Sequence, residues 1–253
     1  MKTMRAVLLG AVLLGPATVS NAGMVTLFDV NFSTPPHTLG EAPATGLGPS
    51  TPSLAIFQPA HVQDDVGNLA LEFGIDVAPD DPNDISRTSS LLLFALDAGA
   101  QRYSIGFDVN AVNLADAGDS FSVAFGTFAE AQGFQIDGSG NVSLDPFSGP
   151  DASGRMSIGT LPQGQFSRFQ FDVDLVARQF DVFQDGMLLV DSADFAPAGD
   201  LEVLSIGFTT INPDSSVVLD NVLVTAQVPE PAVLGLLSLA GLGLALRGSR
   251  RRG

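Results

Sequence analysis

The feature that most constrains the fold is an alternation of apolar and polar side chains with a period of two. Between Phe169 and Leu175 every second residue is Phe, Val or Leu, and the residues between them are Gln or Asp. Successive side chains of a β-strand point to opposite faces, so this pattern predicts a strand with one buried and one solvated face. No segment between the two terminal regions has a sustained 3.6-residue period with helix caps. The sequence therefore predicts an all-β domain, an antiparallel β-sandwich of the jelly-roll type.

Further strands are predicted where short apolar or alternating runs lie between turn residues. They are residues 25–31, 69–77, 90–96, 103–109, 120–128, 133–136, 180–184, 187–190, 203–210 and 217–226. Asp185-Gly186 predicts a two-residue hairpin turn, because glycine adopts a positive φ at no steric cost. Asp137 to Asn141 also predicts a hairpin turn, and the Pro- and Gly-rich segment 33–53 predicts a long surface loop.

The first 22 residues have the three parts of a secretory signal peptide. A positively charged start precedes an apolar stretch, residues 6–19, and small residues then lead to a cleavage site after Ala22. An N-terminal membrane anchor is the alternative, but Pro16 and the short apolar span argue against it. We therefore expect residues 1–22 to be removed on export and residues 23–227 to form the β-sandwich domain.

The last 26 residues, 228–253, also have three parts. Pro229-Glu230-Pro231 breaks regular structure, because proline lacks a backbone N–H and disfavours helix. The apolar run 232–246 follows, and its 15 residues would form a helix of roughly 22 Å against a bilayer core of about 30 Å. Four arginines then hold the far end on the cytoplasmic side: Arg247, Arg250, Arg251 and Arg252. We expect a hydrophobic helix that engages the inner membrane transiently, and a permanent anchor is the alternative.

This tail resembles the PEP-CTERM sorting signal of exopolysaccharide-producing bacteria, with Pro229-Glu230-Pro231 as the signature. The resemblance implies that an exosortase recognises the motif and removes the tail near it. Residues 168–190 followed by 217–224 look like the C-terminal half of a concanavalin A-like lectin or glucanase sandwich. Exported proteins with this tail often end their folded domain in an Asp-Asn strand, here at Asp220-Asn221. Together these features imply a β-sandwich flanked by an N-terminal signal helix and a C-terminal hydrophobic helix.

The charge of the domain excludes several partners. Six of the 11 basic residues and one of the 28 acidic residues lie in the two terminal segments, which leaves 27 acidic and 5 basic side chains and no lysine between them. Nucleic acid and anionic membrane surfaces would repel such a body. Cations, neutral or cationic polymers and other proteins remain as partners. There is no cysteine, so neither a disulfide nor a thiolate metal site can form.

One acidic segment is a candidate metal site. Asp80, Asp81, Asn83 and Asp84 lie within five residues around Pro82, and carboxylate and amide oxygens are the ligands that Ca²⁺ prefers. A solvated turn without metal is the alternative, because Asp and Asn also favour turn geometry. No other cofactor is predicted.

Catalytic residues are not predicted. Asp172 and Asp174 alternate on a strand, but they should lie on its solvated face, and retaining glycosidases need two carboxyl groups about 5 Å apart in a cleft. His37 and His61 lie in proline-containing segments that look irregular and lack metal-ligand spacing. Sugar sites usually use Trp, which is absent, and Tyr103 has the pattern of a core residue.

Three functions agree with these features. The first is an exported, non-enzymatic cell-surface or matrix protein, sorted by an exosortase, with a structural or adhesive role in exopolysaccharide or biofilm. The second is a lectin-like carbohydrate-binding module, with or without Ca²⁺. The third is a glycoside hydrolase. The sequence favours the first, because both ends carry export signals and no catalytic constellation is present.

Overall fold

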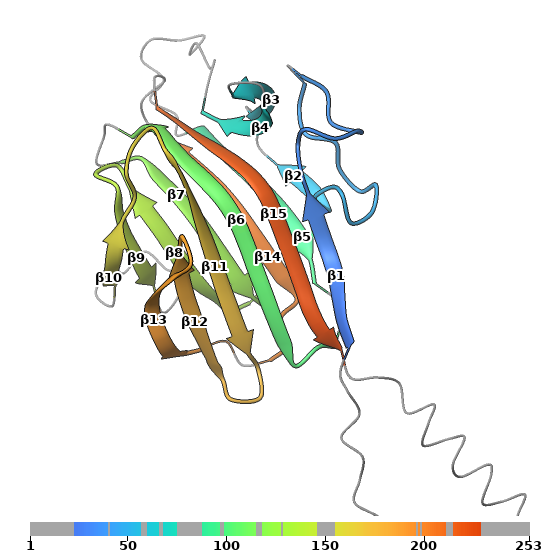
Figure 1. The fold of residues 1–253 in the computed structure, drawn as a ribbon, viewed down its shortest axis with the longest axis vertical. Helices are drawn as coiled ribbons and strands as arrows, with labels where there is room; N and C mark the ends of the chain where they lie inside the picture. The colour runs from blue at the N-terminus through green and yellow to red at the C-terminus, as the bar shows by residue number, and fades with distance from the viewer. Residues whose placement is uncertain are drawn as a thin grey trace, which may run out of the picture. The chain divides into compact units, whose positions relative to one another are not determined.

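Two antiparallel β-sheets contain all the regular secondary structure of the described residues (Figure 1). The computed structural model describes residues 23–39, 41–56, 60–65, 68–74, 88–96, 99–114, 118–127, 129–145, 155–195, 197, 199–210 and 215–228. Residues Met24–Val228 form one compact unit.

The first sheet, sheet A, has eight strands. They are β1 (Gly23–Val30), β3 (Ala60–Asp65), β4 (Asn68–Phe73), β6 (Arg102–Asn113), β11 (Phe166–Asp174), β12 (Gln179–Gln184), β13 (Met187–Asp194) and β15 (Ser216–Val228). Their order across the sheet is β13-β12-β11-β6-β15-β4-β3, and β1 also pairs with β15. Strands far apart in the chain, such as β6 and β15, are therefore neighbours.

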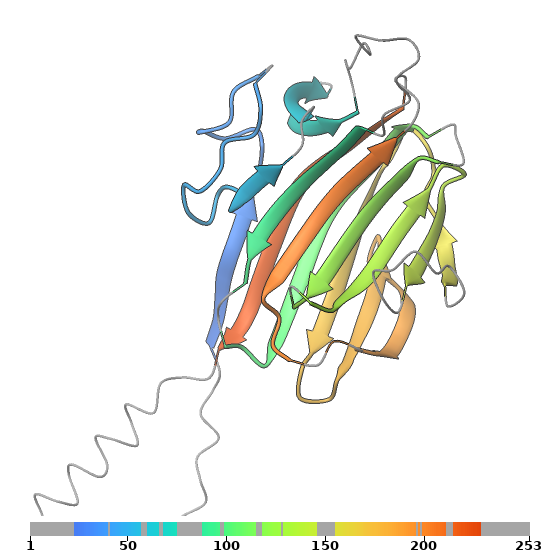
Figure 2. The same cartoon turned by 180° about the vertical axis from the view of Figure 1, so that it is seen from behind.

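The second sheet, sheet B, has seven strands and lies toward the viewer in Figure 2. They are β2 (Leu54–Ile56), β5 (Thr88–Ala95), β7 (Ser120–Gly126), β8 (Ala131–Asp137), β9 (Asn141–Asp145), β10 (Met156–Thr160) and β14 (Val203–Thr210). Their order is β10-β9-β8-β7-β14-β5-β2. Every pair of strands whose register is described, in either sheet, is antiparallel.

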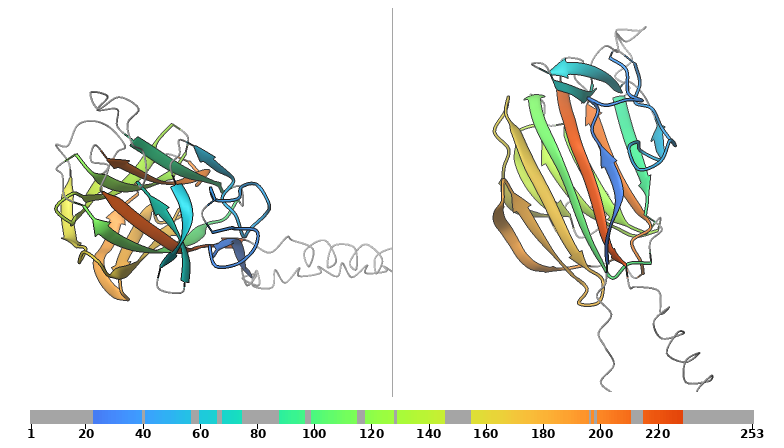
Figure 3. Two further views of the ribbon diagram at one scale, coloured as in Figure 1. Left: turned by 90° about the horizontal axis from the view of Figure 1, so that it is seen from above. Right: turned by 45° about the vertical axis from the view of Figure 1, so that its right-hand side comes forward.

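Phenylalanine rings fill the space between the sheets, which lie face to face in both views of Figure 3. Phe107 of β6 is fully buried, and its ring centroid lies 6.0 Å from that of Phe121 in β7 and 6.2 Å from that of Phe134 in β8. Phe169 and Phe171 of the neighbouring strand β11 each lie 6.0 Å from it, at interplanar angles of 30° and 24°. Burial of these aromatic side chains removes the largest apolar areas of the chain from water.

The predicted all-β, antiparallel sandwich is confirmed. Asp185 and Gly186 form the predicted hairpin turn between β12 and β13, with φ values of 51° and 78°. Asp137 to Asn141 connects β8 to β9, as predicted, and Asp137 Oδ1 accepts hydrogen bonds from the backbone N–H groups of Ser139 and Asn141. The assignment to the concanavalin A-like class stays a prediction.

Three strands differ from the prediction. The sequence placed His61 in an irregular segment, but this residue lies in β3, where it pairs with Glu72 of β4. Strand β3 has the sequence Ala-His-Val-Gln-Asp-Asp, which has too few apolar residues to show a period of two. Strands β2 and β10 were also not predicted, because the first is only three residues long and the second contains a glycine at an irregular pairing.

The predictions for both termini lie outside the described residues. These are the signal peptide with its cleavage after Ala22, the motif Pro229-Glu230-Pro231, the C-terminal hydrophobic helix, and the basic cluster of Arg247, Arg250, Arg251 and Arg252. Within the part of the chain that is described, no helix is long and apolar enough to cross a membrane.

Candidate functional site

The outer face of sheet A carries rows of polar side chains. On β6, Tyr103, Ile105 and Phe107 are buried between the sheets, so their neighbours at even positions point to the outer face. Strand pairing extends these positions into rows. One row contains Asp181, Asp172, Ser104 and Thr225, and the next contains Gln179, Asp174, Arg102 and Gln227. Four strands, β12, β11, β6 and β15, therefore present a continuous polar surface.

A groove of about 530 Å³ lies on this surface. Three carboxylates line it, those of Asp172, Asp174 and Asp181, together with the side-chain amides of Gln170 and Gln227. Its volume falls within the range of about 300–1,000 Å³ that small-molecule sites occupy. Carboxylates and amides supply both acceptors and donors, which are the groups that bind sugar hydroxyls or a cation.

Arg102 and Asp174 form an ion pair at the groove. The Nη2 and Nε atoms of Arg102 lie 2.7 Å and 2.9 Å from Asp174 Oδ2. Asp174 Oδ1 also accepts hydrogen bonds from the backbone N–H groups of Ala177 and Val176. The hydrogen bond from the Ala177 N–H is the main cause that lowers the pKa of Asp174 below 3.8. Partial burial acts in the opposite direction, and Arg102 and the Val176 N–H lower the pKa further. Asp174 is therefore ionised at neutral and mildly acidic pH.

Asp172 and Asp181 lie side by side in the lining of the groove. They are direct cross-strand partners on β11 and β12. Asp172 Oδ1 accepts hydrogen bonds from Ser104 Oγ at 2.7 Å and Gln170 Nε2 at 2.9 Å, and Asp181 Oδ1 accepts one from the backbone N–H of Ser192 at 2.7 Å. Neither carboxylate forms an ion pair with a described residue.

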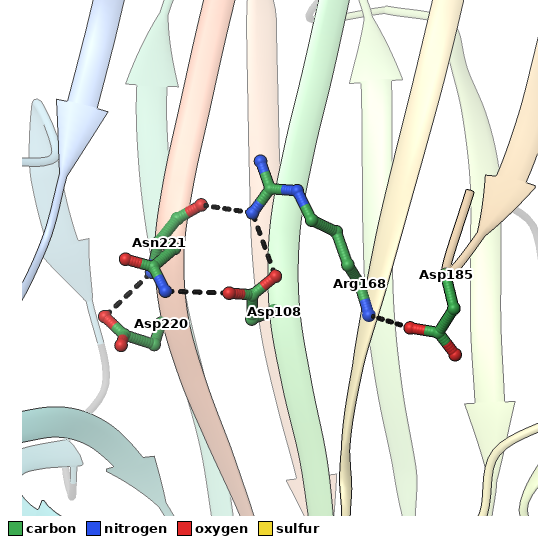
Figure 4. Close-up of polar contacts among 5 residues, drawn as sticks. All are labelled: Asp108, Arg168, Asp185, Asp220 and Asn221. Atoms are coloured by element: carbon green, nitrogen blue, oxygen red, sulfur yellow. Dashed lines mark hydrogen bonds and ion pairs between the residues drawn. The ribbon is translucent and has the colours of Figure 1, made fainter. Parts of the chain in front are cut away.

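A second polar network lies two rows away on the same face (Figure 4). Asp108 of β6 accepts hydrogen bonds from Arg168 Nη1 at 2.8 Å and from Asn221 Nδ2 at 2.7 Å, and so connects β11, β6 and β15. The backbone N–H of Arg168 donates to Asp185 in the β12–β13 turn. Gly106 lies between this network and the groove, and a Cβ atom there would be 2.7 Å from Arg168 Nη2. Glycine thus leaves room for the guanidinium group on the surface of β6.

Asn221 forms a β-bulge that sets which residues of β15 face the groove. Its φ is 49°, and its backbone N–H donates to Asp220 Oδ1. Asp220 pairs with Asp108 and Leu223 pairs with Gly106, so two residues of β15 oppose one residue of β6. Beyond the bulge Val222, Val224 and Ala226 are buried, whereas Leu223, Thr225 and Gln227 are half-exposed.

Asp80, Asp81, Asn83 and Asp84 lie outside the described residues, so the Ca²⁺ site stays a prediction. Among the residues that are described, no group of three or more His, Asp or Glu side chains could hold a metal ion.

Asp172 and Asp174 lie on the face opposite the core, as their alternation predicted. Tyr103 is buried, as its pattern predicted. The groove partners Arg102, Asp181 and Gln227 were not identified from sequence, since each comes from a different strand.

His37 lies away from this face, in the loop between β1 and β2. Its ring is buried against Phe32, with centroids 4.9 Å apart, and its Nε2 lies 3.2 Å from the carbonyl oxygen of Ser50. A carbonyl only accepts, so Nε2 carries the proton. Burial lowers the pKa of His37 below 6.5, although the hydrogen bond to Ser50 acts in the opposite direction. His37 therefore has the features of a neutral structural histidine.

Comparison with known proteins finds solved structures that share the fold of this chain. No protein-family model matches the sequence, and no curated protein matches it. The chain is similar to the carbohydrate esterase vb_24B_21 from Shiga toxin-encoding bacteriophage phi24B, with a TM-score of 0.55 and 14% identity over 81% of this chain and 100% of that chain. It is also similar to the binding domain of Paraclostridial Mosquitocidal Protein 1, with a TM-score of 0.52 and 10% identity over 81% of this chain and 49% of that chain.

A third similar structure is of botulinum neurotoxin type C, described as dependent on two ganglioside molecules for cell entry. Its TM-score is 0.50 at 6% identity, over 89% of this chain and 52% of that chain. This chain therefore spans about half the length of the two toxin chains that it matches. At these identities the likeness shows that the described β-sandwich is shared with all three proteins.

Proposed function

We propose that this protein is an exported, non-catalytic carbohydrate-binding β-sandwich that works at the cell surface or in the extracellular polysaccharide. The observation that carries the proposal is the groove on the outer face of sheet A. Its amides and carboxylates come from neighbouring strands and can donate to and accept from several hydroxyl groups of one glycan. The similar structures include a carbohydrate esterase and a toxin whose entry depends on gangliosides, and their shared fold supports the same reading.

Removal of two groove amides tests this proposal. The double variant Gln170→Ala, Gln227→Ala should lose about tenfold in affinity for a bound polysaccharide, because each lost hydrogen bond is worth about 0.5–1.5 kcal/mol. Calorimetry or affinity electrophoresis on a panel of polysaccharides would measure the loss. Gln135→Ala is a matched control, since Gln135 is half-exposed on β8 in sheet B. Equal affinity of the double variant and the control would reject the groove as the binding site.

Two related proposals can be tested with the same polysaccharides. Calcium dependence, through Asp80, Asp81, Asn83 and Asp84, predicts that a chelator weakens binding and that added Ca²⁺ restores it. The absence of catalysis predicts that no reducing ends appear when the protein is incubated with the polysaccharide that it binds. Release of reducing ends would instead favour the glycoside hydrolase.

We further propose that the termini direct this protein to its place of action. The signal peptide would take it through the inner membrane, and an exosortase would recognise Pro229-Glu230-Pro231 and remove the tail. Replacement of these three residues by alanine should leave the protein in the membrane fraction of a cell that contains an exosortase. Normal release of this variant would contradict the sorting proposal. Replacement of Asp200 by alanine is the control for any effect that a substitution outside the motif has on release.

A further inference from the structure

The groove on sheet A has more negative than positive charge. Its lining contains the carboxylates of Asp172, Asp174 and Asp181 and one guanidinium group, that of Arg102. Arg102 already pairs with Asp174. Two carboxylates, those of Asp172 and Asp181, are therefore left without a cation among the described residues of the groove.

Asp172 and Asp181 also occupy an unfavourable arrangement for like charges in a sheet. They are direct cross-strand partners, so their Cβ atoms are about 4.5–5.5 Å apart. Their hydrogen bonds come from neutral donors, namely Ser104, Gln170 and the backbone of Ser192, and these donors do not cancel the two charges. A positively charged group in the groove would relieve this repulsion.

The chemistry of such a group follows from the lining. A phosphate, sulfate or carboxylate on the ligand would be repelled by these carboxylates and by the excess of 27 acidic over 5 basic residues in the domain. A protonated amine has three donors and fits between two carboxylates, while hydroxyl groups beside it can bond to Gln170 and Gln227.

We infer that the groove binds a polysaccharide whose sugar units carry protonated amino groups, held between Asp172 and Asp181. This inference rests on the proposed carbohydrate-binding function and names its ligand class.

The test compares two ligands that share a backbone and differ in the group at the sugar nitrogen. Chitosan oligosaccharides have free amines, and chitin oligosaccharides of the same length have the same backbone with neutral acetamides. Calorimetry with the full chain at mildly acidic pH should give about tenfold tighter binding of chitosan. The preference should shrink when salt is added, because the Debye length falls to about 3 Å at 1 M ionic strength.

Asp181→Asn identifies the groups responsible. It keeps an acceptor oxygen for the N–H of Ser192 and removes one charge, so chitosan binding should weaken about two- to fivefold while chitin binding is unchanged. Asp200→Asn removes a charge from an exposed residue outside the groove and should leave both affinities unchanged. The thermal midpoint of unliganded Asp181→Asn should be equal to or above that of the parent, because the repulsion is relieved. If this variant does not fold, Asp172→Asn gives the same comparison.

The possible results separate the amine specificity from the carbohydrate-binding function on which it rests. Equal affinity for chitosan and chitin overturns the amine specificity and leaves the carbohydrate-binding proposal in place. No binding of either ligand, or of any polysaccharide in the panel, overturns both. A preference for chitosan that is the same in Asp181→Asn and the parent overturns the assignment to this groove.

Discussion

Replacement of Asp108 by alanine tests whether the network in Figure 4 holds three strands together. The change removes two hydrogen bonds to a carboxylate, from Arg168 and from Asn221. Hydrogen bonds to charged groups are worth about 1.5–3 kcal/mol when buried, whereas exposed ion pairs give about 0.2–1 kcal/mol. The side chains of Arg168 and Asp108 are 40% and 21% exposed, so the lower part of this range applies. We expect a loss of about 1–2 kcal/mol, which lowers the thermal midpoint by about 2–8 °C in a domain of this size.

Urea unfolding of the single and double variants would measure this energy. Asp108→Ala, Arg168→Ala and the double variant form a cycle, in which we expect a coupling of about 0.5–1 kcal/mol that decreases at high salt. Asp200→Ala, a change at an exposed aspartate, is the control and should remain within about 0.5 kcal/mol of the parent. If Asp108→Ala is as stable as this control, or the coupling is zero, the network does not stabilise the sheet and its description as a three-strand connection is wrong.

Three further predictions concern packing and pH. Phe107→Ala should lower the free energy of unfolding by about 3–5 kcal/mol, because its ring is fully buried. Phe166→Ala should lower it by less than about 1 kcal/mol, because Phe166 is 40% exposed. Equal losses on urea unfolding would contradict this arrangement of the core. Gly74→Ala should lower the free energy of unfolding by about 2–5 kcal/mol, because Gly74 has a φ of 99° and an added Cβ would lie 2.7 Å from Phe208 Cε1. An unchanged thermal midpoint would contradict this close packing around Gly74. Burial lowers the pKa of His37 in the folded state, so the unfolded state takes up a proton first as the pH falls. The free energy of unfolding should therefore decrease below about pH 6.5. It should level off below the pKa of His37 in the folded state. His37→Gln should lack this decrease in urea titrations across pH, and an identical slope in both proteins would assign it to other groups.

The sequence was sufficient for features that depend on near neighbours. The alternation from Phe169 to Leu175 identified β11 and its buried face, since a strand fixes side-chain direction by a period of two. Asp185-Gly186 identified the hairpin turn because both residues tolerate a positive φ. Strand β3 was not found, because its polar residues give no such pattern.

The groove could not be derived from the sequence. Asp172, Ser104 and Gln227 line it together, but they belong to β11, β6 and β15 and are brought together only by the order and register of these strands. Composition indicated the excess of carboxylates, yet not that Asp172 and Asp181 would be direct partners. Pairing of strands across long separations depends on the packing of both faces, which local patterns do not contain.

The β-bulge at Asn221 is a local feature that determines which side chains of β15 line the groove. Before it, the odd-numbered residues of β15 face the core, as Leu219 does, and after it the even-numbered residues do, as Val224 does. A regular strand would keep one parity, so Val224 would lie on the polar face and Gln227 would point into the core. The hydrogen bond from Asn221 to Asp108 fixes the bulge against β6, 113 residues away in sequence. The network in Figure 4 therefore acts on the groove without lining it, because it holds the register that places Gln227 there.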